Sequence, residues 1–534
     1  MGGQSCVICQ KDASKRCGGC CQVYYCNKEH QKLDWAKHKH TCNPFKVCED
    51  PVLGRHLVAT RDIAVGEVIL KEPPLLQGPS QVTGPVCLSC LQAVSQHNSE
   101  PCSQCGWPLC LKPKCRESKQ HLPECRWTMD KRKNPVKISQ FITPHPSYEC
   151  ITTLRLCYAK RHSPGLWGRL CKLQSHTEER RGTHKYKEDT RTVAQFLRRF
   201  YKLEDEFSDE DIMDIWGIIQ VNGHEVPLTQ PAHVAVYDLS SMLEHSCHPN
   251  CAKSFASDAS LVLRAVVKVS AGQHLSICYT DCLWGTVNRQ YHLRDTKFFT
   301  CQCPRCLDPT EMGTYFSAIL CEKSDCSGTM LPASLCSLVE ATPWTCDSCG
   351  HVVYDSQVEA TLQQAGQELA TLQSKNLSES TKFLEKWRSK FHQNHFYLTE
   401  VRLAIAERMG QETPQGIRGL SPECLQYKVN LTRDLLELLS LIAPGETRVL
   451  GMLNFGLHAC LAERARRDHL QGHDQFYSAL MESLECLDKT IFFLAVEPEV
   501  LPEGKLLLQA KQNKAELLNT LQNIQMCASM ASPM

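Results

Sequence analysis

Cysteine spacing is the feature that most constrains the fold of this chain. The 534-residue sequence contains 34 cysteines, and 30 of them lie before residue 351 in short, spaced groups. The first ten residues lack the apolar core of a signal peptide, which predicts an intracellular chain with reduced thiols. Reduced C-x2-C pairs accompanied by histidines are typical of zinc sites. The sequence therefore predicts a fold organised by structural zinc.

The first group holds eight potential zinc ligands, too many at ordered spacing for scattered core cysteines. They are Cys6, Cys9, Cys17, Cys20, Cys26, His30, His38 and Cys42. Because zinc takes four tetrahedral nitrogen or sulfur ligands, eight ligands make two sites. Their order, with "VYYC" and "WAKHKHTC", resembles the cross-braced MYND finger. The resemblance implies one site with Cys6, Cys9, Cys26 and His30, and another with Cys17, Cys20, His38 and Cys42.

Three further groups extend the pattern. A second, looser copy of the finger consists of Cys87, Cys90, Cys102, Cys105, Cys110, Cys115, His121 and Cys125. Such repetition indicates an internal duplication, interpreted here as a divergent MYND finger. A third group, Cys301, Cys303 and Cys306, needs a fourth ligand from elsewhere, and a ribbon-like fourth group consists of Cys321, Cys326, Cys346 and Cys349. Since protein fills every coordination position, we expect about six zinc ions with structural roles.

Two segments read as β-hairpins, and a helical region follows the last cysteine group. Residues 52–76 and 259–281 alternate β-branched and polar residues around "DIAVGE" and "SAGQ". The basic stretch 172–187 lacks periodicity, which favours an exposed loop over a binding patch.

Beyond residue 355 the apolar residues follow helical spacing, with breaks at "APGE" and "VEPEVLPEG". The predicted buried positions are Leu425, Val429, Leu436, Leu439, Leu484, Leu487, Ile491 and Leu494. Ser421 followed by Pro422 is typical of a helix start. The pattern predicts an antiparallel helical array.

The order of these features is similar to that of a known family. A hairpin, a finger, a helical insert, "HSCHPN", a hairpin ending in "ICY" and C-x-C-x2-C together resemble the SET and MYND domain (SMYD) lysine methyltransferases, in particular the arthropod SmydA group. The resemblance covers nearly the whole chain. It implies an α+β multidomain fold, with a split, β-rich SET fold, zinc-binding fingers and an all-α TPR-like C-terminal domain.

The resemblance also implies domain boundaries. The N-terminal MYND finger covers 1–45, and the SET domain covers 46–300, interrupted by the divergent finger at 87–125. A post-SET zinc segment at 301–309 and a zinc-ribbon-like segment at 310–354 precede the helical domain at 355–534. For that last domain the resemblance implies a role in closing one side of a substrate cleft and in binding partners. The helical pattern alone is equally consistent with a plain stabilising bundle.

The site residues follow from the same resemblance. Cys247 of "HSCHPN" completes the third zinc site, and Tyr279 is the catalytic tyrosine of a site that uses S-adenosylmethionine. The residues implied around that cofactor are Arg55, Asn222, Glu244, His245, Tyr279 and Phe299. Aromatic rings suit a sulfonium and a methylated ammonium through cation–π attraction. The plainer interpretations are a strand tyrosine for Tyr279 and a turn residue for Asn222.

Four positions depart from the family pattern. Glu244 replaces an asparagine whose amide contacts the cofactor, and Glu keeps an acceptor but loses the donor. Lys297 stands where the family often has a second channel tyrosine, with Phe298 as a substitute filler if Lys297 points outward. Gln273 replaces the acidic residue of a Gly-Glu pair, and His56 replaces a glycine of the first cofactor loop.

The sequence leaves two functions open. One is a protein-lysine N-methyltransferase that acts on histone or non-histone lysines in transcriptional or signalling regulation, in cytoplasm and nucleus. The other is a weak or inactive scaffold whose MYND fingers bind proline-rich partners for repression. Since 59 basic residues nearly balance 58 acidic ones, direct nucleic-acid binding is not expected. No run approaches the ~18 consecutive apolar residues of a membrane helix, which excludes a membrane-spanning class.

Overall fold

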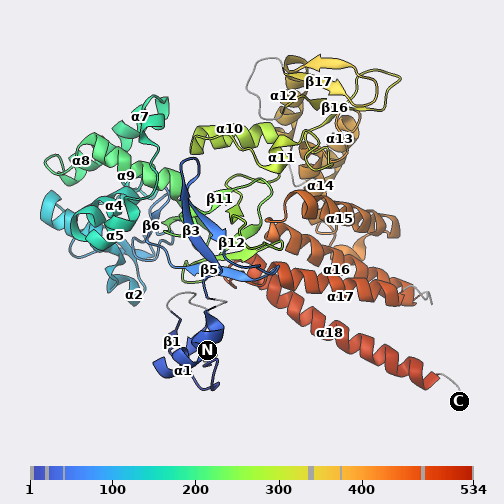
Figure 1. The fold of residues 1–534 in the computed structure, drawn as a ribbon, viewed down its shortest axis with the longest axis horizontal. Coiled ribbons are helices and arrows are strands. Elements are labelled where there is room, and N and C mark those ends of the chain that lie inside the picture. The colour runs from blue at the N-terminus through green and yellow to red at the C-terminus, as the bar shows by residue number, and fades with distance from the viewer. Residues whose placement is uncertain are drawn as a thin grey trace.

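The computed structural model describes residues 5–17, 23–39, 42–334, 342–372, 376–470 and 476–531. Figure 1 shows a central region of short strands with a helical lobe on one side and a stack of long helices on the other. The N-terminal finger lies below the central strands. No helix within the described residues is both long and apolar enough to cross a membrane.

The N-terminal finger combines a two-stranded ribbon with one helix. Strand β1 (Lys15–Arg16) pairs antiparallel with β2 (Tyr24–Tyr25), and α1 (Lys28–His38) follows. The Asn27 side chain accepts a hydrogen bond of 2.8 Å from the His30 backbone N–H and so caps α1. This cap places His30 in the first turn of the helix, next to Cys26.

The centre of the molecule is built from short sheets. Strand β3 (Phe45–Asp50) pairs with β4 (Gly54–Ala59). A second sheet has the order β12 (Cys251–Phe255), β13 (Leu261–Ala265) and β5 (Val68–Glu72), and a third has the order β6 (Leu76–Pro79), β10 (His233–Val236) and β9 (His224–Val226). In a fourth, β11 (Glu244–His245) runs parallel to β14 (Ser276–Ile277). Residues far apart in sequence therefore meet, since segments near residues 50, 230 and 260 share one buried core.

The prediction of two local hairpins was wrong. Strand β4 pairs with β3, whereas β5 pairs with β13. Strand β14 pairs in parallel with β11 and not with β13. The two predicted turns instead meet each other through the bridges Ile63–Val269 and Val58–His274. Alternation of apolar residues identifies an extended segment, but burial against distant segments selects its partner.

The second finger lies at the edge of a helical lobe. Its elements are β7 (Ser99–Pro101), β8 (Pro108–Cys110), α2 (Pro113–Arg116) and α3 (Leu122–Trp127). The helices of the lobe are α4 (Ile151–His162), α5 (Pro164–Leu170), α6 (Thr177–Arg181), α7 (His184–Asp189), α8 (Gln195–Tyr201) and α9 (Asp209–Asn222). Helix α9 begins with a reciprocal capping box between Ser208 and Asp211.

The prediction of an exposed loop at 172–187 was wrong in part, because this stretch contains α6 and the start of α7. Arg180 and Tyr186 within it are buried. The Arg180 guanidinium donates to the Met213 carbonyl and lies 3.9 Å from the Asp189 carboxylate. Buried partners on neighbouring helices convert a polar stretch into packed structure.

Two connecting elements and a four-stranded ribbon link the centre to the C-terminal helices. They are α10 (Thr286–Lys297), α11 (Pro304–Leu307), β15 (Ile319–Leu320), β16 (Thr329–Pro332), β17 (Pro343–Cys346) and β18 (Val352–Tyr354). The ribbon strands pair antiparallel in chain order.

The C-terminal third is a stack of helices, as predicted. Its helices are α12 (Asp355–Thr371), α13 (Leu377–Trp387), α14 (Phe396–Arg408), α15 (Pro422–Ile442), α16 (Thr447–Leu470), α17 (Phe476–Phe493) and α18 (Pro502–Ala531). From α13 onward each helix packs on the next. Ser421 caps α15 by accepting from the Cys424 backbone N–H. The predicted break "APGE" lies between α15 and α16, and "VEPEVLPEG" covers most of the α17–α18 connection and the first residues of α18. Leu425, Val429 and Leu439 are buried, whereas Leu436 is half-buried.

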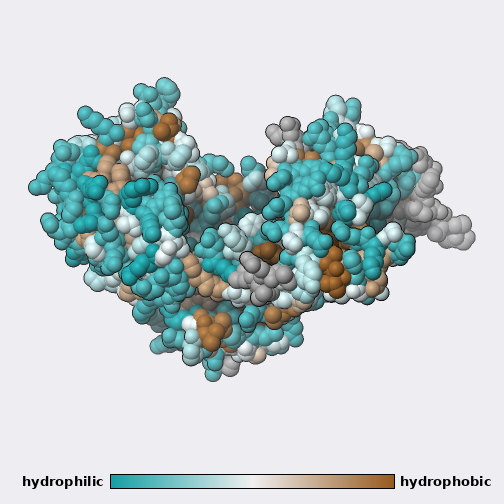
Figure 2. Space-filling model, turned by 90° about the horizontal axis from the view of Figure 1, so that it is seen from above, coloured by the Kyte–Doolittle hydropathy of each residue, from teal (hydrophilic) through white to brown (hydrophobic). Residues whose placement is uncertain are grey.

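The helical stack docks on the central strands through α17. The buried Arg264 of β13 donates to the backbone carbonyls of Phe492 and Phe493 at the end of this helix. Figure 2 shows the surface deeply hollowed between the helical lobe and the C-terminal stack. The central strands therefore form the floor between two walls.

Candidate functional site

The N-terminal finger brings together the ligands of its first predicted zinc site. The ligand atoms of Cys6, Cys9, Cys26 and His30 all lie within 4.8 Å of one another. In the second predicted set, the Sγ atoms of Cys17 and Cys42 lie 3.6 Å apart, and His38 is buried. Cys20 lies outside the described residues.

The second finger is also cross-braced. One cluster contains Cys87, Cys90, Cys110 and Cys115, and the other contains Cys102, Cys105, His121 and Cys125. Along the chain, successive ligand pairs alternate between the two clusters, so the two sites interlock. The sequence pattern identified these eight residues but had not assigned them to sites.

The third and fourth groups also form closed clusters. Cys247 joins Cys301, Cys303 and Cys306, with the Cys247 and Cys306 Sγ atoms 3.4 Å apart. The ribbon cluster contains Cys321, Cys326, Cys346 and Cys349. Four soft thiol donors around one point fit zinc, and no donor position is left to a solvent ligand. These clusters therefore fit structural zinc sites rather than catalytic ones.

A buried ionic network that the sequence pattern did not reveal surrounds the Cys247 cluster. Glu311 lies 3.1 Å from the Arg289 guanidinium and 2.9 Å from that of Arg305, and all three side chains are fully buried. Although burial raises the pKa of Glu311, the two guanidinium groups outweigh it and lower the pKa below its ordinary value. Arg305 also donates to the carbonyls of Cys282 and Ile442. The network therefore joins the zinc segment, the central strands and α15, through isolated residues that carry no sequence signal.

Tyr279, two residues after the end of β14, lies in an aromatic group. Its backbone N–H donates to His245 Nδ1 over 3.0 Å, and its hydroxyl donates to the Leu243 carbonyl. The His245 ring centroid lies 5.2 Å from that of Tyr279 and 5.8 Å from that of Phe299. Burial and the Glu244 charge raise the pKa of Tyr279, so the phenol stays protonated at neutral pH. Three of the predicted site residues are thus brought into one cluster.

Arg55 and Asn222, also implied around the cofactor, both contact the segment between α5 and α6. Arg55 Nη2 donates to the Lys172 carbonyl over 2.6 Å, and Asn222 Nδ2 donates to the Gln174 carbonyl over 2.7 Å. Asn222 is the last residue of α9 and also donates to the Ile218 carbonyl. Both side-chain donors are thus held by backbone carbonyls of the insert.

Two of the departures from the family pattern, Glu244 and His56, are joined through His274. Glu244 Oε1 lies 2.5 Å from His274 Nδ1, and the His274 ring stacks on the ring of His56 at 4.6 Å between centroids. His56 is buried, and its Nδ1 lies 3.0 Å from the Gly54 carbonyl. Gln273 stays in its exposed turn, where its side chain accepts from the Ser270 N–H. The sequence comparison singled out Gln273, whereas the neighbouring His274 makes the contact.

Lys297 points inward at the end of α10. Its Nζ donates to the Val221 carbonyl over 2.6 Å and lies 5.8 Å from the Tyr279 ring centroid. Burial, followed by the charge of Lys253, lowers the pKa of Lys297 to about 8. Phe298 adopts a left-handed backbone conformation and its ring packs against His176. The condition under which Phe298 would fill this space, an outward-pointing Lys297, is therefore not met.

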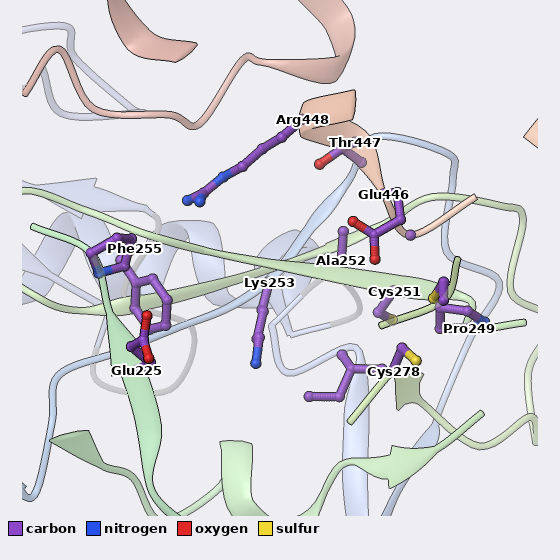
Figure 3. A pocket seen from close by; sticks show the side chains of 14 residues that line it. Glu225, Pro249, Cys251, Ala252, Lys253, Phe255, Cys278, Glu446, Thr447 and Arg448 are labelled. Carbon is purple, nitrogen blue, oxygen red and sulfur yellow. The ribbon is translucent and has the colours of Figure 1, made fainter. Parts of the chain in front are cut away.

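A cavity of about 290 Å³ lies between the central strands and the start of α16. Figure 3 shows Lys253 extending from β12 into the cavity, while Glu446 and Arg448 approach from the opposite side. Cys278, the residue before Tyr279, forms part of its wall. The cavity is lined by Glu225, Pro227, Pro249, Cys251, Ala252, Lys253, Phe255, Ile277, Cys278, Cys282, Gly445, Glu446, Thr447 and Arg448. Its wall thus carries charges of both signs and includes Cys278, the chain neighbour of Tyr279.

Comparison with known sequences matches two domain families. Residues 6–42 match the MYND finger and residues 54–280 match the SET domain. The SET domain-containing protein SmydA-8, isoform A, of Drosophila melanogaster is 29% identical over 314 residues, which cover 58% of this chain and 65% of that protein. The chain therefore spans less than two thirds of that relative's length.

One further sequence relative and one solved structure also match. The histone-lysine N-methyltransferase SMYD3 of Mus musculus is 27% identical over 265 residues, or 47% of this chain and 59% of that protein. The solved SET domain of LSMT bound to lysine and AdoHcy is 13% identical, covers 91% of this chain and 92% of that chain, and has a TM-score of 0.26. That structural likeness is too distant to support an argument.

Proposed function

Since the chain belongs to the SET and MYND domain family, with SmydA-type relatives, we propose that it is an S-adenosylmethionine-dependent protein-lysine N-methyltransferase. The observation that carries the proposal is the position of Tyr279. Its ring lies among His245 and Phe299, and the preceding residue, Cys278, lines the cavity that reaches the helical stack. A methyl donor on one side of Tyr279 and an acceptor lysine in the cavity would meet at this ring.

The residues on the donor side fit the proposed cofactor. The rings of His245, Tyr279 and Phe299 suit an adenine and a sulfonium. Glu244, partly exposed beside them, offers an acceptor to the ammonium of the amino-acid end. When bound, S-adenosylmethionine supplies the methyl group.

The chain's own residues would position the acceptor. The Tyr279 hydroxyl, anchored by the Leu243 carbonyl, presents an oxygen lone pair that can orient a neutral amine. The aromatic group excludes water from the reacting atoms. Glu225 and Glu446 on the cavity wall offer carboxylates to a basic peptide.

A weak or inactive scaffold is the second candidate, and two observations favour it. Glu244 is already engaged by His274, and Lys297 places a cation next to Tyr279. Two unit charges about 4 Å apart repel by about 4 kcal/mol at an effective dielectric of 20. Binding of proline-rich partners by the fingers, a role in transcriptional regulation and residence in cytoplasm and nucleus stay predictions of the resemblance.

Titration calorimetry of zinc-replete protein with S-adenosylmethionine, alongside methyl transfer to lysine-containing peptides, tests the proposal. We expect micromolar binding and transfer that stops in Tyr279→Phe. Binding without transfer to any lysine would favour the scaffold, and absence of binding would refute the enzyme proposal.

A further inference from the structure

Lys297 is a lysine that lies beside Tyr279, the residue proposed to orient the acceptor amine. Its Nζ lies 5.8 Å from the Tyr279 ring centroid, and the side chain is mostly buried. Its hydrogen bond is to the carbonyl of Val221, the residue before Asn222. Two residues later along the chain, Phe299 packs near His245. The amine is therefore next to the residues proposed to hold the methyl donor.

The chemical state of this amine suits a nucleophile. Only a neutral amine has the lone pair that attacks a methyl group. Because burial and the charge of Lys253 lower the pKa of Lys297 to about 8, a substantial neutral fraction exists slightly above neutral pH. The proposal requires the flexible four-carbon stem to leave the Val221 carbonyl and turn towards the Tyr279 hydroxyl.

We propose that Lys297 is itself a methyl acceptor, so that the protein methylates its own site. This inference rests on the proposed methyltransferase function. The Lys297 nitrogen forms a bond to the methyl carbon while the sulfur–methyl bond breaks and S-adenosylhomocysteine leaves. The charge of the sulfonium passes to nitrogen, and the amine releases one proton to solvent. Each methyl group removes one N–H donor, which weakens the hold on the Val221 carbonyl.

The direct test is mass spectrometry of the full-length, zinc-replete protein incubated with isotope-labelled S-adenosylmethionine near pH 8.5. We expect labelled methyl groups on the peptide that contains Lys297. Lys297→Arg keeps a cation but should abolish this label. Lys268→Arg, at an exposed lysine between β13 and β14, is the matched control and should leave the label unchanged. The peptide that contains Lys253 serves as an internal comparison and should carry no label.

A second readout does not depend on methyl transfer. Acetic anhydride acylates neutral amines, so Lys297 should react at pH 8, and saturating S-adenosylhomocysteine should slow its acylation severalfold while exposed Lys268 is unaffected. If S-adenosylhomocysteine binds but leaves Lys297 acylation unchanged, the amine is not beside the donor and the inference is wrong.

The outcomes separate this inference from the proposed function. Calorimetric binding with labelled external peptides but unlabelled Lys297 refutes self-methylation and leaves the enzyme proposal standing. Absence of S-adenosylmethionine binding refutes both. Label on Lys297 that is lost in Lys297→Arg supports both.

Discussion

Glu244 and His274 are direct partners, with Oε1 of the carboxylate 2.5 Å from Nδ1 of the imidazole. An acid thus stands where the family has an asparagine, and its partner is His274, which also forms a bridge to Val58 of β4. The ring of His56 stacks on the ring of His274. Three unusual residues form one connected structure. A change at Glu244 therefore acts on His274 as well as on a cofactor.

Glu244→Asn should strengthen S-adenosylmethionine binding roughly fivefold, because an amide donor is worth about 1 kcal/mol. Stability should change by under about 1 kcal/mol, since both partners are partly exposed and such pairs contribute little. Calorimetry and thermal unfolding measure the two effects. His274→Leu is the matched control, since it removes the donor to Glu244 without adding the amide at residue 244. Equal strengthening by both variants would attribute the gain to release of Glu244 rather than to the amide.

Zinc should be present at about six ions per chain, as judged by plasma mass spectrometry of purified protein. Cys306→Ser should lose one ion and increase hydrogen exchange around Arg289 and Arg305, because metal binding supplies folding free energy. Cys424→Ser is the control, since Cys424 is exposed and lies outside the clusters. Chelation should unfold segments before residue 350 and spare α13 to α18. Retention of all zinc in Cys306→Ser would contradict the assignment of this ligand.

Glu311→Gln should cost about 3–5 kcal/mol of unfolding free energy, because it leaves two buried guanidinium groups without a counter-charge. The pKa of Glu311 is lowered by Arg305 and Arg289, so its stabilisation is present above the unfolded pKa of about 4.3 and is lost as pH falls through the folded value. Denaturant unfolding at several pH values should show the difference between the two proteins shrinking in acid. Glu100→Gln, at an exposed pair with Arg116, should cost under about 1 kcal/mol.

Lys297→Met should stabilise the protein by on the order of 1–2 kcal/mol at pH 7, as measured by denaturant unfolding. The pKa of Lys297 is about 8 in the folded protein and ordinarily 10.5. Between pH 8 and pH 10.5 the unfolded chain therefore binds more protons than the folded one, and the stability of the wild-type protein rises with pH in that range. The advantage of the variant should therefore shrink from pH 8 to pH 10.5. Lys253, His224, His292 and Tyr279 are the titratable groups around Lys297. Lys268→Met should show no such dependence, and a parallel response in both variants would contradict the buried cation.

Gly66→Ala should destabilise the protein more than Gly272→Ala. Both glycines have positive φ, +84° and +86°, so each substitution carries the same backbone strain of about 1–2 kcal/mol. A Cβ at Gly66 would also lie 2.6 Å from Phe492 Cε2 at the end of α17, whereas one at Gly272 meets nothing within 4 Å. We expect an extra loss of about 1–3 kcal/mol and faster proteolysis near α17. Equal losses would show that the Phe492 ring yields without cost.

The sequence by itself determined the local chemistry. Ligand spacing identified the cysteines and histidines of four of the five clusters named above, because half of each site comes from one tight turn, whereas Cys247 of the remaining cluster came from the family resemblance. The cap at Ser421 and the breaks between the last helices follow from residues within one turn of each boundary. The SET-type motifs around Cys247 and Tyr279 were recognisable for the same reason.

Only the tertiary structure decided the partners. Strands β4 and β5 were predicted as strands but pair with β3 and β13, since burial against distant segments selects the register. Whether Lys297 points into the site or outward was open in the sequence, and the fold holds it over Tyr279 through the Val221 carbonyl. The contact of Glu244 with His274 joins residues 30 positions apart. Such relationships depend on how separate segments pack, and local sequence carries no signal for them.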